Sequence, residues 1–198
     1  KEIYFSTANQ FNIKRWWHVS ASYDFMWNTL DADMYNFAKP DRISNLISVA
    51  TAMNLSRVKL QASGVMTLIH DNLRGQQAPA DKHVFTPAVY ASFLPLRSRD
   101  FSLRAFVKQS YRMPTFNDLY YADMGNSKLD PEKVTQYNVG VLYDHSARGL
   151  LSAVRLSADA YYNEVTNKIV AYPKGQQFRW TMLNLGKVDI KGIDISAM

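Results

Sequence analysis

The chain has 198 residues, 47% hydrophobic and 20% charged, so it is long enough to bury a core and its composition is not that of a disordered chain. It contains no cysteine, which excludes disulfides, thiolate metal sites and cysteine nucleophiles. The net charge is +6, but the 23 Lys and Arg are spread along the chain, so the charge does not indicate a nucleic-acid partner. No stretch approaches the roughly 20 consecutive apolar residues of a membrane-spanning helix.

Residues 16–27 alternate between apolar and polar side chains, and this period of two predicts a β-strand. Its apolar ends, Trp17 and Trp27, are ten residues apart. That spacing is about 33 Å along a strand, and a tilt of roughly 40° projects it to about 25 Å, the height of the lipid-facing band of an outer-membrane barrel. We therefore assign Trp17 and Trp27, and further along the chain Tyr143 and Tyr162, to the aromatic girdles of such a barrel. The apolar face consists of Trp17, Val19, Ala21, Tyr23, Phe25 and Trp27.

The same alternation returns along the rest of the chain, in residues 43–55, 58–71, 101–113, 135–143 and 154–163. We predict an all-β fold, an antiparallel meander of about eight to ten long strands. Short connections are expected at 56–57, 97–100 and 145–149, and long ones at 31–42, 71–82, 112–133 and 163–182. Short turns at one rim and long loops at the other are typical of an outer-membrane barrel.

The alternative fold is a soluble secreted β-sandwich or carbohydrate-binding module. Alternating strands are also typical of a soluble antiparallel sheet with one wet face, and two such sheets would pack their apolar faces into a dry core. The strand length, the aromatic strand ends and the small residues on the faces favour the barrel. Catalytic motifs such as G-x-S-x-G, H-E-x-x-H or a phosphate-binding glycine loop are absent from the sequence, so we predict that the protein is not an enzyme.

The segment that begins at Ser110 contains a characteristic set of residues, which we call the box. A strand ends in an aromatic-Arg-x-Pro turn, an acidic-Leu-Tyr stretch follows, and a GN-x-x-L-x-PE element leads into the next strand. These elements are Tyr111, Arg112 and Pro114, then Asp118, Leu119 and Tyr120, then Gly125, Asn126, Leu129, Pro131 and Glu132. With LSADAYYNEVTNKI from Leu156 and NLGKVDIKGIDIS from Asn184, the box closely resembles the C-terminal half of TonB-dependent receptor barrels.

The resemblance implies part of a transmembrane barrel of about 22 strands in the bacterial outer membrane. It implies uptake of a scarce nutrient, such as a ferric chelate or cobalamin, with energy coupled from the inner membrane. The implied partners are the lipid bilayer, the small-molecule nutrient and the periplasmic protein TonB, acting through an internal plug. We expect residues 1–198 to be a partial barrel domain, with the plug domain, the N-terminal strands and the closing C-terminal strands absent. The first residues lack the pattern of a secretion signal.

Aromatic faces with polar tips are concentrated in the loop that carries the box, and they suit an amphipathic ligand. An aromatic girdle at the outer rim, with Arg112 and Asp118 only fixing the loop, explains the same residues. Four isolated histidines do not form a metal-site spacing, and residues 115–125 lack a histidine, which disfavours haem. We predict no metal and no cofactor. The candidate ligand-binding residues are Tyr111, Arg112, Phe116, Asn117, Tyr120 and Tyr121.

Overall fold

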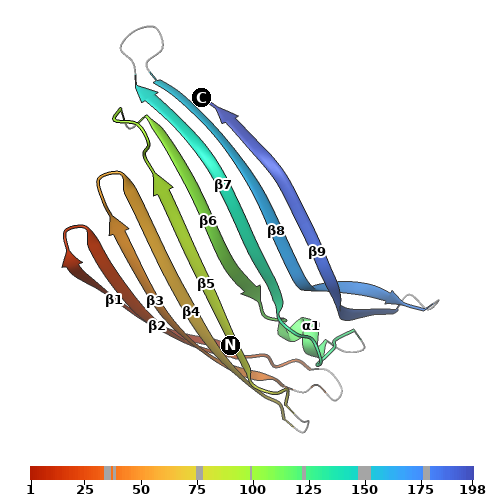
Figure 1. The fold of residues 1–198 in the computed structure, drawn as a ribbon. Helices are drawn as coiled ribbons and strands as arrows, with labels where there is room; N and C mark the ends of the chain where they lie inside the picture. The colour runs from red at the N-terminus through yellow and green to blue at the C-terminus, as the bar shows by residue number, and fades with distance from the viewer. Residues whose placement is uncertain are drawn as a thin grey trace.

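The computed structural model describes residues 1–33, 37, 39–74, 78–98, 100–121, 124–146, 153–175 and 179–198. These residues form one nine-stranded antiparallel sheet in which every strand pairs with its neighbours in sequence, and one short helix, α1 (Figure 1). No helix among them is long and apolar enough to cross a membrane. The predicted meander of eight to ten strands is confirmed. The elements are β1 Glu2–Lys14, β2 Trp17–Thr29, β3 Asp41–Asn54, β4 Val58–Asn72, β5 Lys82–Phe93, β6 Phe101–Arg112, α1 Phe116–Tyr120, β7 Glu132–Ser146, β8 Ala153–Lys174 and β9 Arg179–Ala197.

The strand register gathers the apolar side chains on one side of the sheet, which we call the outer face. Phe25 of β2 lies opposite Phe5 of β1, and Val139 of β7 lies opposite Ala160 of β8. A slip of one residue would turn every side chain of a strand to the other face, so the alternation itself specifies this register. The opposite side, the inner face, carries mainly polar residues such as Ser22 and Ser48, whose hydroxyls are 2.6 Å apart.

The outer face is exposed rather than packed. Val139 is 64% exposed, Ile193 72% and Ile195 80%, whereas the buried hydrophobic cluster contains only Leu119, Leu129 and Ile169. Within the described ranges, no second sheet covers the apolar side chains. The sandwich alternative required those faces to meet in a dry core, and the structure contradicts it.

The connections differ in length at the two ends of the sheet, as predicted. Two-, three- and seven-residue connections follow β1, β3 and β5, whereas residues 30–40, 73–81 and 113–131 connect the strands at the other rim. The predicted turn at 145–149 lies mostly outside the described residues. We call the two ends the short-turn rim and the long-loop rim.

The predicted long loop at 163–182 is wrong. β8 and β9 run through it as a hairpin whose pairs extend from Thr166–Lys187 to Lys174–Arg179. Figure 1 shows β8 bending toward its C-terminal end. Asn167 of β8 has a positive φ of 55°, and it interrupts the pairing between Thr166–Lys187 and Lys168–Leu185. The polar composition of residues 163–182 predicts a loop. A hairpin that extends beyond the barrel wall need not alternate between an apolar and a polar face, so its strands lack the period of two.

The end of β6 separates from β5 but stays paired with β7 as far as Arg112 and Glu132. β5 and β6 pair only between residues 88–93 and 103–108. The pairing stops next to Pro87, which has no backbone N–H for a further ladder bond. The loop at 113–131, which contains α1, follows β6 directly and packs against the inner face at the long-loop rim (Figure 1).

Candidate functional site

Two charged side chains that the sequence patterns did not single out anchor the loop at 113–131. Arg42 of β3 donates from Nε and Nη2 to Oδ1 and Oδ2 of Asp71 on β4, at 2.7 and 2.8 Å. Its Nη1 donates to the carbonyl oxygen of Pro114 at 2.9 Å. Both charged residues are buried. A bidentate pair of this kind holds its geometry well, so it fixes the start of the loop on the wall.

The aromatic residues of α1 pack around this ion pair. The guanidinium of Arg42 lies 5.0 Å from the ring centre of Phe116, and the rings of Phe116 and Tyr120 are 6.2 Å apart. Tyr120 also packs against the buried cluster of Leu119 and its neighbours. Burial raises the pKa of Tyr120 to about 12, so its hydroxyl stays protonated at physiological pH.

The charged residues of the box hold the loop together. Thr115 and Asp118 form a capping box at the start of α1. Arg112 Nη1 donates to Asp118 Oδ2 at 3.3 Å and its Nη2 lies 3.6 Å from Glu132 Oε2. Glu132 is buried and also accepts from Lys168 Nζ at 3.0 Å. These contacts match the alternative in which Arg112 and Asp118 fix the loop.

Gly125 lets the loop approach the backbone of α1, and Asn126 attaches the loop to β9. A Cβ at Gly125 would lie 2.7 Å from the carbonyl carbon and oxygen of Leu119, so only glycine allows this approach. The side-chain amide of Asn126 donates to the carbonyl oxygen of Met182 at 3.0 Å. Pro114 and Pro131, which bound the loop, are both buried. The box residues thus have a structural explanation in addition to any ligand role.

The six candidate ligand residues do not form one cluster. Phe116 and Tyr120 are brought together at Arg42, while Asn117 and Tyr121 of the same turn are exposed. Tyr111 and Arg112 end β6, and Arg112 is engaged by carboxylates. Contact of Tyr111, Arg112, Phe116, Asn117, Tyr120 and Tyr121 with a ligand stays a prediction.

The four predicted girdle residues lie on the outer face, three of them near strand ends and Tyr162 in the middle of β8. Trp17 begins β2, and Tyr143 is close to the end of β7, both at the short-turn rim. Trp27 and Tyr162 lie toward the long-loop rim, where the rings of Tyr162 and Tyr137 are 6.0 Å apart. Their contact with the membrane interface stays a prediction.

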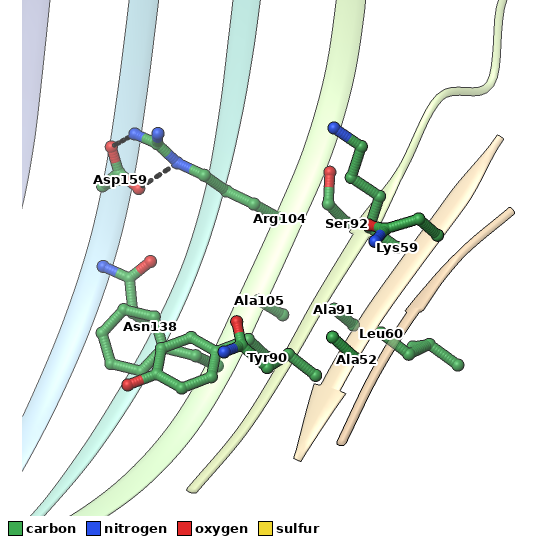
Figure 2. A pocket seen from close by; sticks show the side chains of 13 residues that line it. Ala52, Lys59, Leu60, Tyr90, Ala91, Ser92, Arg104, Ala105, Asn138 and Asp159 are labelled. Atoms are coloured by element: carbon green, nitrogen blue, oxygen red, sulfur yellow. Dashed lines mark hydrogen bonds and ion pairs between the residues drawn. The ribbon is translucent and has the colours of Figure 1, made fainter. Parts of the chain in front are cut away.

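Nearer the short-turn rim, the inner face has a hollow of about 470 Å³ (Figure 2). Lys59 and Arg104 line it together with Tyr90 and Asn138, and Figure 2 shows Arg104 reaching across the wall to Asp159. Arg104 Nε donates to Asp159 Oδ1 at 3.0 Å, and a second bond joins Nη2 to Oδ2. The hollow is therefore charged.

Gly140 makes the ion pair between Arg104 and Asp159 possible. The register places Gly140 of β7 directly between Arg104 of β6 and Asp159 of β8, and a Cβ there would overlap Asp159 Oδ1. Gly140→Ala is expected to break the pair and lower the free energy of unfolding by about 1–3 kcal/mol. Urea unfolding of the receptor in lipid vesicles measures this.

Gly186→Ala is the matched control, because Gly186 also lies in a strand and a Cβ there meets no atom within 4 Å. We expect it to change the free energy of unfolding by less than about 0.5 kcal/mol. If Gly140→Ala and Gly186→Ala lower the free energy of unfolding equally, these strand glycines affect stability only through backbone entropy.

Comparison with known proteins decides the family. The family described as TonB dependent receptor-like, beta-barrel, matches residues 3–198. The chain belongs to this family. The vitamin B12 transporter BtuB of Vibrio vulnificus is 36% identical over 88 residues, which cover 44% of this chain and 13% of that protein. The same transporter of Photobacterium profundum is 31% identical over 90 residues, 44% of this chain and 14% of that protein.

Solved structures of TonB-dependent receptors share the fold. The Serratia marcescens hemophore receptor HasR, solved with its hemophore HasA and heme, has a TM-score of 0.76 at 11% identity, covering 97% of this chain and 38% of that one. The copper transporter OprC also has a TM-score of 0.76, at 16% identity over 99% of this chain and 34% of that one. The matches thus span between 13% and 38% of the length of these four relatives.

The family assignment confirms two predictions, the fold and the location. The nine-stranded sheet is part of a transmembrane receptor barrel, as the resemblance implied. TonB-dependent receptors are outer-membrane proteins, so the predicted location is confirmed. The relatives are transporters and receptors rather than enzymes. Within the part of the chain that the structure describes, no group of three metal-ligating side chains gathers.

Proposed function

We propose that this chain forms part of the barrel of an outer-membrane receptor that takes up a scarce nutrient, with cobalamin as the first candidate. The match of residues 3–198 to the TonB-dependent receptor barrel carries the proposal. Cobalamin is favoured because the vitamin B12 transporter is 36% identical over 88 residues. The structural neighbours are 9–16% identical and support the fold alone, so they do not favour a substrate.

The loop at 113–131 is the proposed ligand-binding element. Its docking through Arg42 and Asp71 holds α1 against the inner face at the long-loop rim. A loop fixed before the ligand arrives loses little conformational entropy on binding. Exposed Asn117 and Tyr121 would contact the ligand first, with a mixed aromatic and amide surface.

Transport also requires parts that we place outside this chain. We propose that residues 1–198 are a partial barrel domain, and that further strands and a plug complete the receptor. The chain covers 13% of the vitamin B12 transporter and 38% of HasR, which supports this division. The periplasmic protein TonB would act on the plug rather than on residues described here.

Uptake of radiolabelled cyanocobalamin tests the proposal. The full-length receptor would be expressed in cells that lack their own vitamin B12 receptor, with and without TonB. TonB-dependent uptake is expected, and Asn117→Ala with Tyr121→Ala should weaken binding at the cell surface. Arg155→Ala, at the opposite rim, is the control. Uptake of a ferric chelate instead of cyanocobalamin would contradict the proposed substrate. Uptake of neither compound would contradict the proposed function.

A further inference from the structure

A second hollow lies on the inner face beside the loop at 113–131, between β2–β4 and the end of β6. Its volume is about 400 Å³, within the range of small-molecule sites. Register places its strand residues side by side, with Ser44 opposite Met26 and Leu46 opposite Thr67. The hollow is lined by Met26, Asn28, Ser44, Leu46, Thr67 and Met113, among other residues.

This hollow is electrically neutral. Its one charged side chain, Arg42, already donates from Nε and Nη2 to the carboxylate of Asp71 and from Nη1 to Pro114. The remaining polar groups are hydroxyls and the amide of Asn28, whose Nδ2 donates to Glu2 Oε2 at 3.0 Å, set among thioethers and aliphatic side chains. A carboxylate or phosphate placed here would lose its hydration without gaining a cation of its own. An uncharged polar group can be matched by the neutral hydroxyls and the amide.

The Thr67 side chain lines this hollow and is buried. It is 1% exposed, and its hydroxyl has no hydrogen-bond partner among the described residues. Buried hydroxyls in folded proteins are normally paired, and an unpaired one needs an explanation. A rotation of about 120° about χ1 moves the hydroxyl of a threonine to another staggered position, so Thr67 can present its O–H to the hollow that it lines.

We propose that this hollow is a subsite for an uncharged arm of the ligand that ends in a carbonyl or amide, with the Thr67 hydroxyl as donor to its oxygen. The apolar part of the arm packs between the thioethers of Met26 and Met113. The proposal rests on the function proposed above and assigns the ligand class of one part of its site. The hollow lined by Lys59 and Arg104 differs because it is charged.

The test compares Thr67→Val with Thr86→Val in the full-length receptor in detergent micelles. Thr86 also lies on the inner face, but its hydroxyl donates to the Val65 carbonyl at 3.4 Å. Calorimetry with cyanocobalamin, whose rim carries neutral amides, should show binding about 3- to 10-fold weaker for Thr67→Val. Thr86→Val should leave the affinity unchanged. The melting temperature of Thr67→Val should stay level or rise, because the variant removes an unpaired buried hydroxyl.

The outcomes separate the subsite from the function. If the wild type binds cyanocobalamin and Thr67→Val binds it with equal affinity, the proposed subsite is wrong and the proposed recognition of cobalamin is kept. A clearly lower melting temperature in Thr67→Val shows that the hydroxyl has a structural partner, which also overturns it. If the wild type binds an anionic ferric tris-catecholate and not cyanocobalamin, and Thr67→Val weakens that binding, the uncharged class is wrong. If the wild type binds neither probe, the proposed function fails and the subsite with it.

Discussion

Asp71→Ala is expected to lower the stability of the docked loop by about 3–5 kcal/mol, because it leaves the guanidinium of Arg42 buried without its carboxylate. The bond from Arg42 to Pro114 should loosen as the guanidinium moves toward water. Amide hydrogen exchange of the receptor in micelles measures the effect locally. Protection should fall across residues 113–121 and 124–131 and stay unchanged in β7 and β8.

Arg155→Ala is the matched control for this prediction. Arg155 donates to Asp144 at 2.6 Å, but both side chains are solvent-exposed, and such pairs contribute about 0–1 kcal/mol. Arg42→Met combined with Asp71→Leu should recover most of the loss, since neither charge then remains buried. A loss in the control as large as in Asp71→Ala would show that the burial of the pair is irrelevant.

Val139→Arg is expected to lower the free energy of unfolding in lipid vesicles by about 2–4 kcal/mol. Val139 lies in the middle of β7 on the outer face and is 64% exposed in the structure, so its side chain contacts hydrocarbon in a membrane-spanning wall. A guanidinium at that depth must be transferred into lipid or must distort the bilayer to reach water.

Asn138→Arg is the control one residue away. Asn138 points to the inner face, where it lines the hollow of Figure 2. An arginine there stays in a polar environment, and we expect a change below about 1 kcal/mol. Equal losses in the two variants, or a larger loss for Asn138→Arg, would contradict the assignment of the two faces.

The strands and their faces were predictable because the determining signal is local. Each side chain of a strand in a barrel wall meets either lipid or the interior, so residues such as Val19 and Ser20 reveal their faces by alternation alone. The box from Tyr111 to Glu132 was recognised by its resemblance to the family, and its prolines act on neighbouring residues.

The anchor of the loop was not predictable from the pattern. Arg42, Asp71 and Pro114 come from three separate segments, and a charged residue on a polar face does not stand out in sequence. Gly140 does not stand out in the sequence either, because the side chains that require a glycine there, Arg104 and Asp159, come from the two neighbouring strands. The hairpin of β8 and β9 was mistaken for a loop since its outer part extends beyond the region where one face must be apolar.

A nitroxide scan along residues 137–142 of β7 tests the central assignment most directly, and residues 1–198 contribute no cysteine that would compete for the label. Each position of the full-length receptor would carry one label in lipid vesicles, and collisions with oxygen and with a water-soluble nickel chelate would be measured. High oxygen accessibility is predicted at positions 137, 139 and 141, with the chelate favoured at 138 and 142. Gly140 keeps its native residue, because a side chain there would overlap Asp159. Equal chelate accessibility on both sets, or the reverse alternation, would show that the apolar face of this sheet does not contact lipid.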